Sequence, residues 1–192
     1  NYSDEWKDEA KKRGLDCEAC VPIMYDANLT KQSMDMFIRT KVYTEREMES
    51  RTEVRWDLYT KKVQIESRVL ADLSMNHILP IVLEYQTMLI SNVQGMKNLF
   101  GADEFKKLAA RRIELISEIS KRVDIIEKKV NEMVEARKVA NLIESDREKA
   151  LSYATTIFPF FDEIRYHIDK LELIVDNEKW PLPKYRELLF IR

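Results

Sequence analysis

The stretch from Glu45 to Phe100 has the pattern of one very long helix, and it constrains the fold more than any other feature. It begins at Thr44-Glu45-Arg46-Glu47, a capping box in which Thr44 and Glu47 satisfy each other's backbone N–H groups. No glycine interrupts the stretch before Gly95. An unbroken helix here would measure roughly 84 Å at ~1.5 Å per residue, several times the length of an ordinary globular helix. Other helices must therefore pack along it, or a kink must bend it.

One face of this stretch is apolar at helical spacing. Steps of three, four and seven residues predict a helix and not a strand. Glu66 falls on the apolar seam, so we expect it to be buried and paired, where it would set the register of a helix bundle. The stripe consists of Trp56, Tyr59, Val63, Leu70, Leu73 and His77, widened by Ile65 and Val69.

Pro80 is the candidate for a kink in the long helix. Its missing N–H leaves the carbonyl of Asn76 without a partner and its ring crowds the preceding turn, at a cost of about 3 kcal/mol. One interpretation makes Asn76 and His77 a polar site that the kink exposes. The other makes them part of a kink whose freed carbonyl is satisfied by a side chain or by water, and we favour this second interpretation.

Two further helices follow, each with its own apolar seam. The second runs from about Asp103 to Ile143, and the third starts at the capping box Ser145-Asp146-Arg147-Glu148 and carries Pro159 as a second kink. Their lengths allow antiparallel pairing with the first helix. The second seam is Ile116, Ile119, Val123, Ile126, Val130, Met133, Arg137 and Ala140, and the third is Ile157, Phe161, Ile164, Ile168, Leu171 and Val175.

The chain closes on a proline-braced tail. Pro181 and Pro183 fix an extended turn, and Pro183 is well placed as the first residue of a short helix. Trp180, Tyr185 and Phe190 are three large aromatic residues in this short segment, and they require a surface on which to bury. We therefore predict that the tail docks.

These patterns predict an all-α fold. We expect an elongated antiparallel bundle of three long helices, one or two of them kinked at proline, with short helices before it and a short proline-braced helix after it. Residues 1–43 would be the edge of an upstream domain, 44–176 the bundle, and 177–192 the docking tail. Because the first residue is asparagine and a helix pattern already follows Ser3, we expect a piece of a longer chain.

Composition agrees with long helices and excludes several classes of partner. Three glycines and five prolines among 192 residues leave little turn chemistry for a sheet protein. A formal net charge of −2 gives no strong attraction to nucleic acid or to a membrane surface. No apolar run approaches the ~20 residues that span a bilayer, and no signal peptide opens the chain. We expect a cytoplasmic protein.

Few residues offer catalytic or metal chemistry. Cys17 and Cys20 have the spacing of a redox or zinc pair, but no second cysteine pair accompanies them, so incidental reduced thiols are the simpler interpretation. Glu163 and His167 lie one helical turn apart and could share a metal, although a hydrogen-bonded pair is the simpler interpretation. We expect no catalytic residue, cofactor contact or metal ligand here.

Several phrases resemble the carboxyl terminus of type III glutamine synthetases, in the same order and over essentially the whole chain. The longest is Trp-Pro-Leu-Pro-Lys-Tyr-Arg-Glu-Leu-Leu-Phe at 180–190. The others are Tyr-Ser-Asp-Glu-Trp at 2–6, Gln-Ile-Glu-Ser-Arg-Val-Leu at 64–70, Asn-His-Ile-Leu-Pro at 76–80, Pro-Phe-Phe-Asp-Glu-Ile-Arg-Tyr-His at 159–167 and Asp-Lys-Leu-Glu-Leu at 169–173.

The resemblance implies a parent enzyme that joins ammonia to glutamate with ATP, using Mg²⁺ or Mn²⁺. It also implies that the catalytic barrel lies before this segment, so that this segment alone is inactive and supports the barrel and neighbouring subunits of a dodecamer. The alternative, from another class, is a stand-alone coiled-coil module that binds partner helices.

Overall fold

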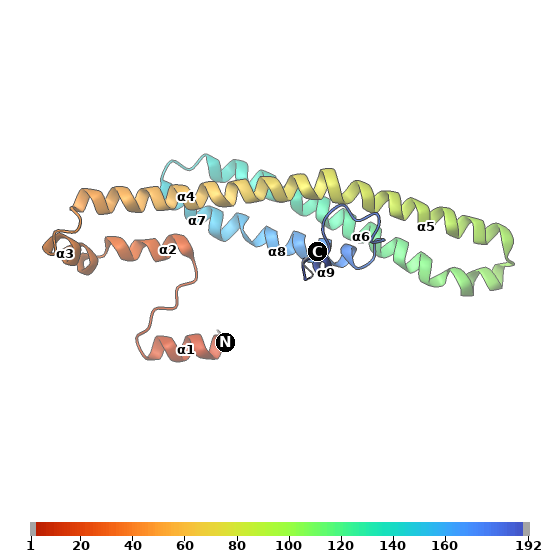
Figure 1. The fold of residues 1–192 in the computed structure, drawn as a ribbon, viewed down its shortest axis with the longest axis horizontal. Coiled ribbons are helices and arrows are strands. Elements are labelled where there is room, and N and C mark those ends of the chain that lie inside the picture. The colour runs from red at the N-terminus through yellow and green to blue at the C-terminus, as the bar shows by residue number, and fades with distance from the viewer. Residues whose placement is uncertain (1–2, 190–192) are drawn as a thin grey trace. The chain divides into compact units, whose positions relative to one another are not determined.

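The computed structural model describes residues 3–189, apart from the side chains of Tyr185 and Arg186. Within this range every regular element is helical and there is no strand, which confirms the all-α prediction (Figure 1). None of the helices in the described part combines the length and the apolar character that crossing a membrane requires.

Contacts divide the chain into two compact units. Unit 1 comprises Asn1–Gln64 and Val139–Thr156, and unit 2 comprises Ile65–Lys138 and Ile157–Arg192. This division is based on contacts and falls inside helices. The boundaries predicted after residues 43 and 176 rest on sequence pattern and stay predictions.

Unit 1 begins with short helices whose caps the sequence supplies. In α1 (Asp4–Lys12) the Ser3 side chain accepts a hydrogen bond from the backbone N–H of Trp6, and Gly14 with φ 74° follows the helix. An irregular segment leads to α2 (Val21–Asp26), the 3₁₀ turn η1 (Ala27–Leu29) and α3 (Lys31–Arg39). Unit 1 also contains α7 (Asp146–Ser152) and the first residues of the π-helical segment η3 (Tyr153–Ile157).

The long helix α4 (Glu45–Asp72) starts at the predicted capping box. The backbone N–H of Glu47 donates to Thr44 Oγ1 at 3.3 Å, and the backbone N–H of Thr44 donates to Glu47 Oε2 at 2.8 Å. These hydrogen bonds lower the pKa of Glu47. In unit 1 the buried face of α4 consists of Met48, Thr52, Trp56, Thr60 and Val63.

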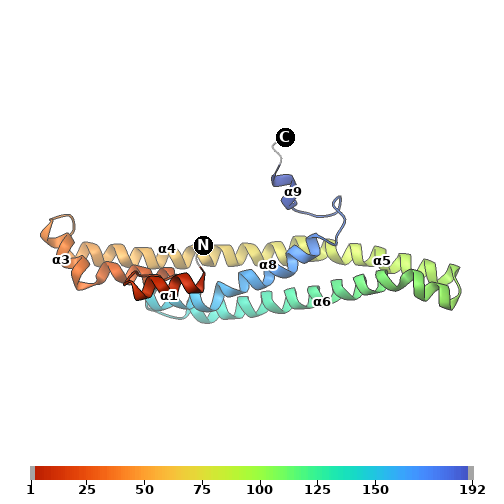
Figure 2. The same cartoon turned by 90° about the horizontal axis from the view of Figure 1, so that it is seen from below.

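Unit 2 is an antiparallel three-helix bundle. After the end of α4 it contains the π-helical segment η2 (Leu73–Ile78), α5 (Leu79–Leu99), α6 (Ala102–Asn141) and α8 (Pro159–Glu172), and it ends with the short α9 (Tyr185–Leu188). In both views α5 runs alongside α6, and α8 lies beside another part of α6 (Figures 1 and 2). Cross-helix bonds fix the antiparallel register: Arg137 to Ser67, Gln86 to Ser120, Lys129 to Glu163 and Arg122 to His167.

The seams of the second and third helices are confirmed. Most of the large predicted residues are buried, and the guanidinium of Arg137, the one charged residue of the second seam, donates to Ser67 Oγ at 3.2 Å. In α5 the buried Gln86 amide donates to the carbonyl of Ile116 at 2.9 Å and to Ser120 Oγ at 2.6 Å. The buried seam residues are Ile119, Val123, Ile126, Val130, Met133 and Ala140, then Ile157, Ile164, Ile168, Leu171 and Val175.

The predicted seam of the first helix is partly wrong. Glu66 is exposed, and so are Ile65 and Val69. The adjacent Ser67 is buried instead, and the buried face continues through Ser74 and Ile78. Small hydroxyl residues can occupy a close helix contact because their side chains are short and hydrogen-bond the preceding turn, as Ser74 Oγ does to the Leu70 carbonyl at 2.6 Å.

A π-helical segment precedes each of the two helix-interior prolines. The backbone N–H of Leu79 donates to the carbonyl of Ser74, five residues earlier, just before Pro80. The segment η3 ends at Ile157, and Pro159 begins α8. A π turn holds one more residue than an α turn. In η2 the residues Ser74 and Ile78, four positions apart, are both buried, and the buried face continues in α5 at Val82 and Gln86.

Candidate functional site

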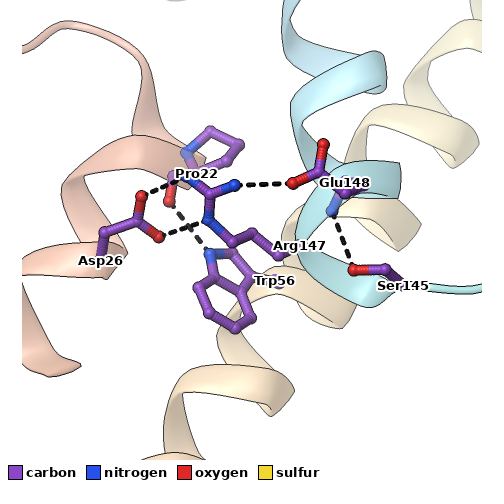
Figure 3. Close-up of polar contacts among 6 residues, drawn as sticks. All are labelled: Pro22, Asp26, Trp56, Ser145, Arg147 and Glu148. Carbon is purple, nitrogen blue, oxygen red and sulfur yellow. Dashed lines mark hydrogen bonds and ion pairs between the residues drawn. The ribbon is translucent and has the colours of Figure 1, made fainter.

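The best-organised polar cluster of unit 1 joins α2 to α7. Arg147 Nε donates to Asp26 Oδ1 at 2.8 Å and Nη2 donates to Asp26 Oδ2 at 2.6 Å, so the pair is bidentate (Figure 3). The third nitrogen, Nη1, donates to Glu148 Oε1 at 2.7 Å. Such two-pronged pairs fix orientation as well as charge.

The local sequence explains why Arg147 is presented here. Ser145 is the N-cap of α7, and its side chain accepts a hydrogen bond from the backbone N–H of Glu148 at 3.4 Å. This cap holds Arg147 in the first turn of α7, while Asp26 is the last residue of α2. The hydrogen bonds from Arg147 lower the pKa of Asp26, and Asp26 raises the pKa of Arg147.

A second contact joins α2 to α4. The indole Nε1–H of Trp56 donates to the backbone carbonyl of Pro22 at 3.0 Å, and both residues are buried. Figure 3 shows the Trp56 indole between α4 and α2, close to the Asp26–Arg147 pair. We name Pro22, Asp26, Trp56 and Arg147 together the α2 clasp. It fastens one short helix to two others of the same unit.

The α2 clasp binds and positions: its one carboxylate, Asp26, accepts two hydrogen bonds from Arg147. Within residues 3–189 no group of three His, Cys, Asp or Glu side chains lies close enough to hold a metal ion. The described residues therefore do not fit a metal held by three protein ligands, and we derive no step through a metal ion or nucleotide in this segment.

The two weaker chemical candidates are the cysteine pair and the Glu163–His167 pair. Cys17 and Cys20 are free thiols, both half-buried. Glu163 pairs with Lys129 at 2.8 Å, whereas Nδ1 of His167 accepts from Arg122 Nη1 at 3.3 Å, so the expected Glu163–His167 hydrogen bond is replaced by two separate contacts. Burial and the neighbouring Arg122 cation lower the pKa of His167.

Asn76 and His77, just before Pro80, both face Asp72. The Asn76 amide donates to Asp72 Oδ1 at 2.6 Å, and His77 Nε2 lies 3.8 Å from Asp72 Oδ2. Asn76, His77 and Pro80 are all exposed. The polar pair is therefore engaged with Asp72, about one turn earlier, and the partner of the freed Asn76 carbonyl stays a prediction.

The tail packs on unit 2 through Trp180 and Lys184, which are both buried. Lys184 Nζ donates to the carbonyls of Glu172 at 2.6 Å and Val175 at 3.0 Å, and it lies 5.7 Å from the centre of the Trp180 ring. It thus satisfies the carbonyl of the last residue of α8 and that of Val175 just beyond it, where a cation is also favoured by the helix dipole. Lys179 forms an ion pair with Glu84 of α5.

The other predicted tail residues are either exposed or have side chains outside the described residues. Pro181 and Pro183 are exposed. The side chain of Tyr185 and the whole of Phe190 lie outside the described residues. Lys184, which sequence reasoning missed, has one weak signal: Glu187 three residues later is placed to cap its backbone N–H, as it does at 3.3 Å.

Comparison with known proteins places these features in a family context. Residues 1–97 match a family model described as the glutamine synthetase C-terminal domain. The chain is 49% identical over 191 residues to "Glutamine synthetase" of Bacteroides fragilis (strain YCH46), covering 100% of this chain and 26% of the relative. It is 26% identical to "Type-3 glutamine synthetase" of Dictyostelium discoideum, and 26% identical to "Glutamine synthetase" of Butyrivibrio fibrisolvens. The chain spans about a quarter of the length of these curated relatives, 26% in each case.

Proposed function

Because the chain belongs to the glutamine synthetase C-terminal domain family, we propose that it serves as the structural, helical segment of a type III glutamine synthetase. The predicted family resemblance is confirmed, and the chain corresponds to the C-terminal segment of its glutamine synthetase homologues. The observation that carries the proposal is the match of 100% of this chain to 26% of a relative at 49% identity.

In this proposal the parent enzyme makes glutamine from glutamate, ammonia and ATP, with Mg²⁺ or Mn²⁺ bound outside this segment. The partners of the segment are the catalytic barrel of the same polypeptide and neighbouring subunits of a dodecamer, in the cytoplasm. Support comes from what the polar groups do here. The α2 clasp and the Lys184 contacts tie helices and chain segments together, and Asp26 and Lys184 are engaged in those contacts.

A chimera tests the proposal. In the Bacteroides fragilis enzyme, replacing the matching C-terminal segment with this chain should leave an assembled and active synthetase, because the two segments are 49% identical. Deleting the segment should lower the melting temperature and the fraction of assembled enzyme, measured by mass photometry beside glutamine formation. This chain alone, given ATP, glutamate, ammonia and Mg²⁺, should form no glutamine.

Two outcomes would overturn the proposal. One is glutamine formation by the 192-residue chain alone. The other is a segment deletion that leaves both assembly and thermal stability of the synthetase unchanged. Since the chimera and the deletion use the same parent, the unmodified parent is the control for both.

A further inference from the structure

A small cavity of about 50 Å³ lies in unit 1 beside the α4 helix. Its polar lining comes from Asn28 of η1, Tyr43, and the arginines Arg51 and Arg55, which are one helical turn apart on α4. Apolar side chains and the buried Thr52 complete the wall. Such a volume exceeds what one water needs and is far below the ~300–1,000 Å³ of sites for drug-sized ligands. It suits a group of a few atoms.

Both arginines are held by aromatic rings. The guanidinium carbon of Arg51 lies 4.6 Å from the centre of the Tyr43 ring, and that of Arg55 lies 5.9 Å from the Tyr25 ring. A guanidinium that uses its face for an aromatic ring keeps its in-plane N–H groups free to donate. Two such groups one turn apart can direct their donors at one acceptor.

The carboxylates near these arginines are already engaged. Glu47 accepts hydrogen bonds from Thr44, and Asp26 accepts both hydrogen bonds from Arg147. Within the part of the chain that the structure describes, neither Arg51 nor Arg55 has a carboxylate within ion-pair distance, and no acidic residue lines the cavity. The cavity wall therefore carries the positive charges of two arginines and no ion-paired carboxylate, while Glu47, outside the cavity, lies near enough to Arg51 for that cation to help lower the Glu47 pKa.

From this arrangement we propose that unit 1 binds a small oxyanion, a phosphate or a carboxylate, between Arg51 and Arg55. The planar guanidinium fork matches both anions in bidentate geometry. The Asn28 amide, which also lines the cavity, is a further donor. This site is independent of the structural role proposed for the segment, because it rests on cavity, charge and ring contacts within residues 25–55.

The test uses the 192-residue chain and two probes, inorganic phosphate and succinate, with sodium chloride at matched ionic strength as the reference. Isothermal titration calorimetry measures affinity, and thermal melting measures stabilisation. We expect phosphate or succinate to bind and to raise the melting temperature beyond the effect of chloride. The probe that binds more tightly identifies the anion class.

Variants locate the binding. Arg51→Gln and Arg55→Gln should each weaken binding about tenfold or more, because each removes charge-assisted hydrogen bonds. Arg51→Lys keeps the charge but loses the fork, so it should also bind more weakly than the unmodified chain. Lys62→Gln is the matched control: it removes one charge from an exposed position of the same helix outside the cavity and should change affinity less than twofold.

Three results would overturn the site. In the first, phosphate and succinate change the melting temperature no more than chloride does, so that only general ionic screening acts. In the second, Arg51→Gln and Arg55→Gln bind the anions as tightly as Lys62→Gln. In the third, a polyglutamate peptide binds but neither small anion does, which would make the surface a protein interface. Circular dichroism of each variant checks that it folds, which the exposure of both arginines favours.

Discussion

Asp26 and Arg147 are 121 positions apart, and their contact is decided by two separate local signals. One is the end of a six-residue helix whose second residue is the buried Pro22, and the other is the Ser145 cap. Side-chain exposures of 34% and 39% mean that water still screens the pair. The pair therefore contributes mainly through its bidentate geometry, which fixes the orientation of α2 on α7. The buried Trp56–Pro22 hydrogen bond beside it fixes α2 on α4.

Asp26→Asn should destabilise the chain at neutral pH by about 1 kcal/mol, a surface-pair figure raised slightly for bidentate geometry. The folded-state pKa of Asp26 is lowered from 3.8, so its contribution is present above the unfolded value and is lost as pH falls through the folded pKa. Urea unfolding of both proteins at pH 7 and pH 3 should therefore show a difference that shrinks at pH 3.

Asp57→Asn is the matched control, because Asp57 forms a simple i, i+4 pair with Lys61 at 2.6 Å. Its effect should be only about 0.3–0.5 kcal/mol. A difference between Asp26→Asn and the unmodified chain that is absent at pH 7, or that grows toward pH 3, would contradict this account.

At the scale of the element, sequence reasoning succeeded where the helix contact is made by large apolar side chains. The seams of α6 and α8 repeat isoleucine, valine and leucine, so hydropathy alone identifies the buried face. On α4 and η2 the contact uses Thr52, Thr60, Ser67 and Ser74, which are at most 6% exposed, while Ile65 is 61% exposed. A hydropathy pattern treats these hydroxyl residues as polar, and it therefore misplaced the seam at Glu66.

The same contrast explains what was predictable at the candidate site. All three capping motifs near it, at Thr30, Thr44 and Ser145, depend on residues within three positions, and local sequence shows them. The Asp26–Arg147 and Trp56–Pro22 contacts depend on how distant segments meet. No periodicity within either segment carries that information.

The α4 seam gives a prediction about register. Ser67→Leu should destabilise the chain by about 1–3 kcal/mol, because it forces extra volume into a closely packed contact. It also removes the hydroxyl that accepts from Arg137. Glu66→Leu, one position away and exposed, should change the free energy of unfolding by less than about 0.5 kcal/mol.

Urea unfolding of the two variants measures both effects under identical conditions. Because both introduce the same side chain into the same helix, helix propensity differs little between them. If the two variants are equally stable, or if Glu66→Leu loses more free energy of unfolding, Glu66 and not Ser67 would be the residue at the helix contact.

At the scale of the whole molecule, the tail separates into an inner and an outer part. Trp180 and Lys184 are 8% and 7% exposed, so they belong to the core of unit 2. Leu188 and Leu189, in and directly after α9, are 71% and 62% exposed. In the proposed synthetase the inner part would stabilise the bundle, and only the outer part would be available to dock on other parts of the enzyme.

Replacing both outer leucines, Leu188→Glu with Leu189→Glu, should therefore lower the assembled fraction of a synthetase that carries this segment, measured by mass photometry. The melting temperature of the 192-residue chain should not change, because these side chains are exposed. Trp180→Ala, by contrast, should destabilise the isolated chain. Its free energy of unfolding should fall by about 3–5 kcal/mol, because the substitution empties a buried aromatic site. Leu142→Glu, at an 82% exposed leucine of unit 1, is the surface control. If the double variant assembles as fully as Leu142→Glu and the unmodified enzyme, Leu188 and Leu189 have no docking role.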